Sequence, residues 1–203
     1  ATFTKQAISL REFKKTGKLR LSQTDIYINT KLTDFNNLKE VRVVPRMHHY
    51  VIEVVYQMKE KTHCDNGKYA SIDLGLNNLA TVAFNEGSKP LIVNGRPLKS
   101  INQYYNKKKA QYQSRLKGGK RTSKRICTLT NKRNNKVTDY LHKASRLLVN
   151  QLVSQGITTL VIGKNKNMKQ DINIGKVNNQ NFVQLPIMRF ADLMKYKCEL
   201  EGI

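Results

Sequence analysis

Acidic residues are scarce in this sequence. Only 14 of the 203 residues are Asp or Glu, against 37 Lys and Arg, which leaves a formal net charge of +23 and a pI near 10.1. In a compact chain such an excess of positive charges destabilises the fold, because the charges repel one another. Proteins that retain it usually bind a polyanion, which neutralises the charge. The composition therefore favours a nucleic-acid partner, and the alternative is a basic surface that serves only solubility.

Long apolar runs and paired cysteines are also lacking. No stretch of about 18 apolar residues could span a bilayer, and residues 1–20 lack the apolar core of a signal peptide. We therefore expect a soluble, intracellular protein with no membrane partner. Cys64, Cys127 and Cys198 include no Cys-x-x-Cys pair, so we expect reduced thiols and no zinc.

Residues 1–58 carry patterns of β structure. Four runs of apolar, β-branched or aromatic residues favour strands, at residues 19–21, 26–28, 41–44 and 50–56. Pro45 begins a turn between the last two runs, which predicts a β-hairpin. Residues 59–68 (KEKTHCDNGK) are polar and include Asn-Gly, a composition typical of a linker, so we place a domain boundary there.

Three short strand-like runs follow this linker. They lie at residues 69–74, 79–84 and 91–93, with Gly or Asn at each junction. Because parallel neighbours need crossovers of about a dozen or more residues, we expect an antiparallel meander.

The hydrophobic period changes after Pro97. Positions with helical spacing predict a first helix that ends at Gly118-Gly119, namely Leu98, Ile101, Tyr105, Tyr112 and Leu116. A second helical pattern begins within residues 122–130 and ends at Gly156, so that residues 97–156 form a two-helix insertion. Residues 157–162 (ITTLVI) predict a strand buried on both faces and parallel to an earlier one, and residues 185–201 predict a last helix.

The predicted two-helix insertion is strongly basic. The 52 residues between Glu86 and Asp139 contain no acid and fifteen Lys or Arg. Charged helix faces usually mix both signs, so a single sign favours phosphate binding over a face that is only solvated. The candidate phosphate-binding residues are Lys107, Lys108, Lys109, Arg115, Lys120, Arg121, Lys124, Arg125, Lys132 and Arg133.

Three tyrosines lie among these charges, at Tyr104, Tyr105 and Tyr112. Such rings can stack on bases. The commoner role is packing along the core stripe of a helix, and the sequence leaves both roles open.

Asp73 ends an apolar strand, between Ile72 and Leu74. A carboxylate in such a position costs roughly several kcal/mol to desolvate unless something compensates it, and a divalent cation does this best. The alternative is an Asp that caps a turn containing Gly75 and Asn77. The residues alone leave both alternatives open.

Four segments together resemble one family. Residues 70–80 (ASIDLGLNNLA) resemble the first motif of the RuvC-type nuclease in the TnpB/OrfB proteins of insertion sequences, relatives of type V CRISPR effectors. Residues 39–57 are similar to the last hairpin of that family's wedge-like β-barrel, and residues 158–165 (TTLVIGKN) to its second nuclease strand. Residues 176–182 (KVNNQNF), followed by Leu-Pro, match the lead into the next helix, so the resemblance covers nearly the whole chain.

The resemblance implies an α/β fold. Residues 69–203 would form an incomplete ribonuclease H-like (RuvC) mixed sheet with a helical insertion, and residues 1–58 a partial wedge-like, OB-like β-barrel. The implied activity is RNA-guided DNA cleavage by Mg²⁺ or Mn²⁺ ions held by three acids, with Asp73 as one catalytic metal ligand. DNA and guide RNA would be the partners, with no small-molecule cofactor, in a cytoplasmic, nucleoid-associated protein. Further candidate nucleic-acid contacts are Lys164, Lys169, Asn178, Asn179 and Gln180.

The sequence departs from the family at the metal site. Gly163 stands where the commonest pattern has a Glu, and glycine cannot ligate a metal. Some relatives take this Glu from the strand after the last helix. The nearest acids here, Glu199 and Glu201, we interpret as helix-surface residues.

The family's zinc-ribbon cysteines, third nuclease acid and first wedge portion are missing as well. We therefore expect a portion of a longer protein, or a decayed transposase, that binds nucleic acid better than it cuts it. One alternative is a non-catalytic binding module in which Asp73 is a relic. Another is a ribosomal-type RNA-packing protein, which fits the charge but not the Asp-Leu-Gly motif. The oligomeric state stays open, with a monomer favoured.

Overall fold

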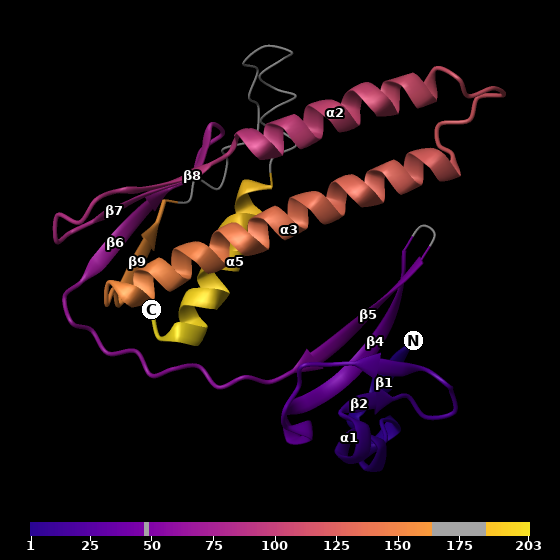
Figure 1. Ribbon diagram of the computed structural model, residues 1–203, viewed down its shortest axis with the longest axis horizontal. Helices are drawn as coiled ribbons and strands as arrows, with labels where there is room; N and C mark the ends of the chain where they lie inside the picture. Colours follow the sequence, from indigo (N-terminus) through magenta and orange to yellow (C-terminus); the bar gives the residue numbers. More distant parts are fainter. Residues whose placement is uncertain (47–48, 164–185) are drawn as a thin grey trace. The chain divides into compact units, whose positions relative to one another are not determined.

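The chain divides into two compact units, Ala1–Lys59 and Glu60–Ile203. The computed structural model describes residues 1–46, 49–163 and 186–203, and Figure 1 shows the elements of each unit. None of the described helices combines the length and the hydropathy that crossing a bilayer requires.

The first unit is mainly antiparallel β structure. Its larger sheet has the order β1-β4-β5, from β1 (Thr2–Thr4), β4 (Leu38–Arg46) and β5 (His49–Tyr56), and β2 (Lys18–Arg20) pairs with β3 (Tyr27–Asn29). The predicted hairpin is confirmed, since β4 and β5 pair from Leu38↔Tyr56 to Arg46↔His49. A small core lies beneath them, formed by Ile8, Leu19, Leu21, Phe35, Leu38 and Val41.

This unit also contains helices that the strand patterns did not predict. They are the 3-10 helices η1 (Lys5–Ala7) and η2 (Phe35–Asn37) and the α-helix α1 (Leu10–Thr16). The Ser9 hydroxyl accepts a hydrogen bond from the backbone N–H of Glu12 at 3.2 Å, and Gly17 ends α1 with φ 70°. A serine cap and a terminal glycine are ordinary helix signals, so this helix could have been predicted.

The second unit contains a four-stranded sheet in the order β8-β7-β6-β9. Its strands are β6 (Tyr69–Asp73), β7 (Asn78–Phe84), β8 (Leu91–Asn94) and β9 (Thr159–Ile162). The antiparallel meander is confirmed for β6, β7 and β8, and β9 pairs in parallel with β6, as expected.

Three helices complete the described part of the second unit: α2 (Arg96–Gln113), α3 (Lys124–Ser154) and α5 (Ile187–Glu201). Figure 1 shows α2 and α3 side by side as a long antiparallel hairpin, with the connection between them extending beyond the sheet. Side chains from the second half of α3, such as Leu141 and Leu148, form one core with α5 and one face of the sheet. The first half of α3 is therefore left to pair with α2.

Two expectations about these elements are wrong. The first helix ends at Gln113, before the glycine pair, and Ser114 Oγ donates to the carbonyl of Gln111 at 3.1 Å at that end. Residues 157–162 do not form a strand buried on both faces. In the described sheet β9 is an edge strand, and Val161 is 54% exposed because the described helices cover only the opposite face.

The polar segment before β6 is fastened to the second unit. Asn66 Nδ2 donates to the carbonyl of Gly156 at 2.9 Å, and Lys61 Nζ donates to Glu201 Oε2 at 2.6 Å. The segment stays exposed, but these two side chains contact the turn before β9 and the end of α5.

Candidate nucleic-acid interface

A groove of about 910 Å³ runs between α2 and α3. The α2 side contributes Ser100, Ile101, Tyr104, Tyr105 and Tyr112. The α3 side contributes five cations, Lys124, Arg125, Lys132, Arg133 and Lys136, together with Thr128 and Leu129. One wall is therefore largely aromatic and the other is largely cationic.

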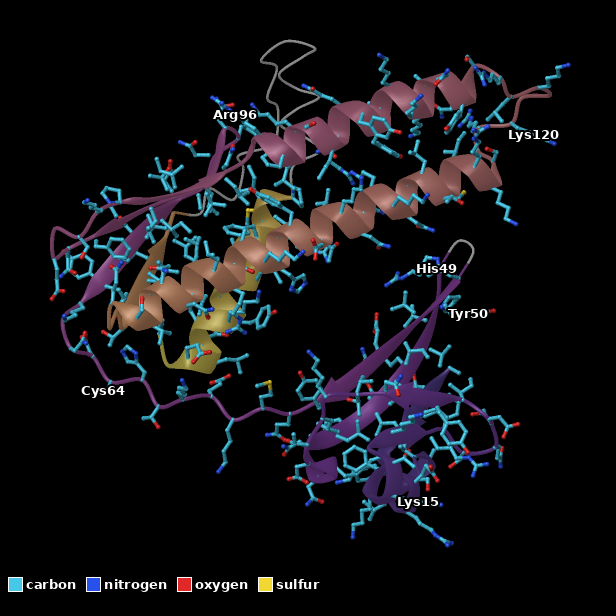
Figure 2. The ribbon with its side chains drawn as sticks, in the orientation of Figure 1. Lys15, His49, Tyr50, Cys64, Arg96 and Lys120 are labelled. Carbon is cyan, nitrogen blue, oxygen red and sulfur yellow. The ribbon has the colours of Figure 1, made fainter. Side chains whose placement is uncertain are left out.

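The chain reverses direction between α2 and α3 with the help of a glycine pair and a helix cap. Gly118 and Gly119 in the connection have φ values of 66° and 69°, a left-handed conformation that favours glycine. The Ser123 hydroxyl accepts a hydrogen bond from the N–H of Ile126 at 3.3 Å and so caps α3. Figure 2 labels Arg96 at the start of α2 and Lys120 in the connection, at opposite ends of the hairpin.

Polar side chains hold the two helices together in the outer part of the hairpin. Arg133 Nε donates to Oδ1 of the buried Asn102 at 2.7 Å. Tyr105 Oη lies 3.1 Å from Thr130 Oγ1, within hydrogen-bond distance, and Thr130 Oγ1 also lies 2.9 Å from the carbonyl oxygen of Ile126. These contacts fix Tyr105 and Arg133 against each other across the groove.

Cations already cover two of the three tyrosine rings. The guanidinium of Arg125 lies 4.6 Å from the ring centroid of Tyr112, and that of Arg133 lies 5.6 Å from the ring of Tyr105. Lys109 Nζ lies 5.8 Å from the same Tyr105 ring. Tyr104 differs from both, because its side chain is 59% exposed.

The positive charge of the groove is not neutralised by nearby acids. Lys124, Arg125, Lys132 and Lys136 form no ion pair with a carboxylate of the residues that the structure describes. Desolvation lowers the pKa of Arg133, with the nearby Tyr105 opposing this, yet a guanidinium remains charged at neutral pH. The groove therefore presents a concentrated cationic surface suited to phosphates.

The groove brings together only part of the predicted set. Lys124, Arg125, Lys132 and Arg133 line it. Other predicted cations lie on the same hairpin outside its lining, namely Lys107, Lys108, Lys109, Arg115, Lys120 and Arg121. Lys164, Lys169, Asn178, Asn179 and Gln180 lie outside the described residues. Lys136 was missed, although it follows Lys132 by one helical turn.

Asp73 stands at the carboxyl end of β6 and is exposed. Its carboxylate is therefore not desolvated in the structure, so it incurs no desolvation cost that a cation would have to offset. Within the described residues this carboxylate accepts no hydrogen bond, and the N–H of Gly75 donates to the carbonyl of Leu79 at 3.4 Å instead. Asp73 lies on the sheet face that also exposes Tyr69 and Ser71, opposite the helix-covered core.

A complete metal site is not formed by the described residues. Among them, no three His, Cys, Asp or Glu side chains gather closely enough to hold a metal ion. Mg²⁺ requires several hard oxygen ligands, and Asp73 supplies only one carboxylate. These residues alone therefore do not fit the pair of ions implied by the family resemblance.

The two acids nearest the end of the chain have other partners. Glu201 Oε1 lies 3.2 Å from Arg146 Nη1, in addition to the Lys61 contact at Oε2, and the hydrogen bond from Lys61 lowers the pKa of Glu201. Glu199 lies 3.9 Å from Lys195, one turn earlier on α5. Glu201 thus joins α3 and α5 to the segment that enters the amino end of β6, whereas Asp73 lies at its carboxyl end.

Fold and groove together define a mixed α/β protein with a surface typical of nucleic-acid binders. The family model OrfB_IS605, described as "Probable transposase", matches residues 49–169, which is more than half of the chain. The chain belongs to this family, and the resemblance inferred from its motifs is confirmed. No curated protein matches the chain significantly.

Two solved structures share the fold. The cryo-EM structure of the Cas12f1-sgRNA-target DNA complex aligns over 81% of this chain with a TM-score of 0.53 and 14% identity. The cryo-EM structure of the CRISPR-Cas12f ternary complex aligns over 81% with a TM-score of 0.54 and 15% identity. The chain spans 40% and 33% of those two proteins, respectively.

Proposed function

We propose that this chain is the nucleic-acid-binding portion of a transposon-encoded, RNA-guided DNA endonuclease. The observation that supports this best is the groove between α2 and α3, where cations of α3 lie opposite tyrosines of α2. Lys124, Arg125, Lys132 and Lys136 form no ion pair with a carboxylate of the described residues. Phosphate contacts supply most of the affinity of such surfaces, for DNA and RNA alike. Cytoplasmic location and association with the nucleoid are part of the same proposal.

The domain assignment is also a proposal. Residues 1–58 would belong to a wedge-like β-barrel, which agrees with the antiparallel order β1-β4-β5. Residues 69–203 would form an incomplete ribonuclease H-like domain, in which the α2–α3 hairpin is the insertion. The antiparallel meander followed by the parallel strand β9 supports this assignment.

Charge reversal tests nucleic-acid binding by the hairpin. The variant Lys132→Glu/Lys136→Glu should weaken binding of both DNA and RNA. On a single strand it should also reduce the slope of log affinity against log salt by roughly 0.7 for each lost phosphate contact.

Lys143→Glu/Lys195→Glu is the matched control, because it changes the charge equally at positions outside the groove, where the two side chains are 77% and 73% exposed. Equal effects of both double variants on affinity and slope would show that the groove is not a specific contact.

Cleavage is a second candidate function, favoured by the exposed carboxylate of Asp73 at a strand end. In a longer protein that supplies the remaining acids, Asp73 would hold Mg²⁺ or Mn²⁺. Asp73→Ala in that protein should abolish cleavage of guided DNA in Mg²⁺ and leave DNA binding intact. Unchanged cleavage would favour the alternative, a non-catalytic binding module.

A further inference from the structure

The α2–α3 groove differs from a plain basic surface because an open aromatic ring lies within its cationic lining. We infer that it takes an unpaired stretch of nucleic acid, with a base stacked on Tyr104 and the neighbouring phosphates held by cations of α3. This inference rests on the proposed function and adds that the bound nucleic acid is unpaired. Binding to phosphates alone requires no aromatic ring, so the two statements can fail separately.

The size and lining of the groove suit one or two nucleotides. Its volume is about 910 Å³, and sites for small organic ligands occupy about 300–1,000 Å³. In a duplex each base is covered above and below by its neighbours. An aromatic side chain reaches a base face only where the strand is unpaired or its bases are splayed out.

Tyr104 is the ring with an available face. Tyr112 has Arg125 over it, and Tyr105 has Arg133 and Lys109 over it while its hydroxyl bonds to Thr130. Those two rings help to hold the hairpin together. Tyr104 is 59% exposed and still lines the groove, so its ring is free to receive a base.

The α3 side supplies the matching charge. Lys132 and Lys136 are exposed, lie one helical turn apart and line the same groove. Ammonium groups on flexible stems hold phosphates without reading their sequence. A binding mode that combines stacking with such contacts tolerates many sequences, as is usual for single-strand sites.

Three DNA probes test the inference on the 203-residue chain. They are a short oligodeoxyadenylate, an abasic strand of equal length and a duplex of equal length, each followed by fluorescence anisotropy at one salt concentration. Tyr104→Ala should weaken binding of the oligodeoxyadenylate about 5- to 150-fold, the fold-change that corresponds to losing one stacked base. Binding of the abasic strand and of the duplex should stay unchanged, since neither offers an unpaired base.

Two further variants separate stacking from other effects. Tyr104→Phe keeps the ring and should restore wild-type affinity for the oligodeoxyadenylate. Tyr50→Ala removes a ring that is 72% exposed in the first unit and should leave that affinity unchanged. Because Tyr104 is exposed, its loss should not impair folding, which circular dichroism checks.

The outcomes distinguish the stacking inference from the proposed function of the hairpin. An equal loss on all three probes, or no loss on the oligodeoxyadenylate, overturns the stacking inference and leaves hairpin binding standing. If Lys132→Glu/Lys136→Glu changes no affinity at all, the proposed function of the hairpin fails first.

Discussion

Gly163 lies beside Asp73 at the carboxyl ends of two adjacent parallel strands. The N–H of Gly163 donates to the carbonyl of Ile72 at 3.3 Å, one residue before Asp73, and the register pairs Ile72 with Ile162. Neighbouring strands lie about 4.8 Å apart. A side chain at position 163 would therefore project next to the Asp73 carboxylate, on the face of the sheet that also exposes Val161.

We predict that Gly163→Glu creates a weak site for Mn²⁺. The Cβ atom that this substitution adds would lie 3.8 Å from the Ile72 carbonyl oxygen, an ordinary contact, so the strand should accept it. Two neighbouring carboxylates repel each other, and a divalent cation relieves the repulsion. Calorimetric titration should show tighter binding of Mn²⁺ to the variant than to the wild-type chain.

Two controls identify the ligands of that engineered site. Gly163→Gln introduces a side chain of the same size as Glu without its charge and should not bind Mn²⁺. Gly163→Glu/Asp73→Asn should lose the Mn²⁺ binding again. Equal Mn²⁺ affinity in all three variants would mean that Asp73 and position 163 do not act together.

We predict that Gly95→Ala destabilises the second unit by about 1–3 kcal/mol, the usual range for overpacking. A Cβ atom at this position would overlap the carbonyl oxygen of Leu76, a backbone atom that cannot rotate away. Urea unfolding gives the free energy, and Gly163→Ala, which has an open contact, is the control. Equal stabilities of the two variants would contradict the close approach at Gly95.

Much of the fold was predictable because its signals are local. The hairpin of β4 and β5, the meander and the parallel strand β9 follow from short runs of β-branched residues and the polar turns between them. The exposure of Val161 did not follow, since an apolar run does not reveal whether anything covers its second face. Helix α1 was missed although Ser9 and Gly17 mark its two ends, because seven residues carry little hydrophobic periodicity.

The site was predictable as a region but not as a groove. The absence of acids between Glu86 and Asp139 predicts that the two-helix insertion is basic, whatever its detailed structure. Both sides of each helix are basic, so spacing alone does not tell which cations face the partner helix. Lys136 lines the groove and Lys107 does not because of how α2 and α3 pack, which depends on contacts such as that between Arg133 and Asn102.

We predict that Lys197→Met leaves the protein at least as stable as the wild type at pH 7. Lys197 is buried between α3 and α5, where its ammonium donates to the carbonyl of His142 at 2.9 Å and to Ser145 Oγ at 2.6 Å. Both acceptors are neutral, and no carboxylate of the described residues forms an ion pair with it. Burying an ammonium group without a countercharge costs free energy, so an apolar chain of similar volume should be tolerated.

The pH dependence of stability provides a second measurement for Lys197. Desolvation, and to a smaller extent Arg146, lower the pKa of Lys197 below its ordinary value of 10.5. The unfolded chain then binds more protons in the window just below pH 10.5, so the free energy of unfolding should rise with pH there. Lys197→Met should remove this rise, and Lys195→Met, at an exposed position on the same helix, should not.

We predict that Cys64 is the only one of the three cysteines that reacts readily with iodoacetamide in the folded protein at pH 8. Cys64 is exposed, whereas Cys127 and Cys198 are buried. Burial, with a smaller contribution from Glu199 and Glu201, raises the pKa of Cys198 to about 11, so at pH 8 its thiol is almost entirely protonated. Only the thiolate is nucleophilic, and access and ionisation therefore protect Cys198 together. Mass spectrometry of the alkylated peptides should show modification of Cys64 within minutes and of the other two only after unfolding in urea. Labelling of Cys198 at the rate of Cys64 without denaturant would show that α5 does not pack against α3 as described.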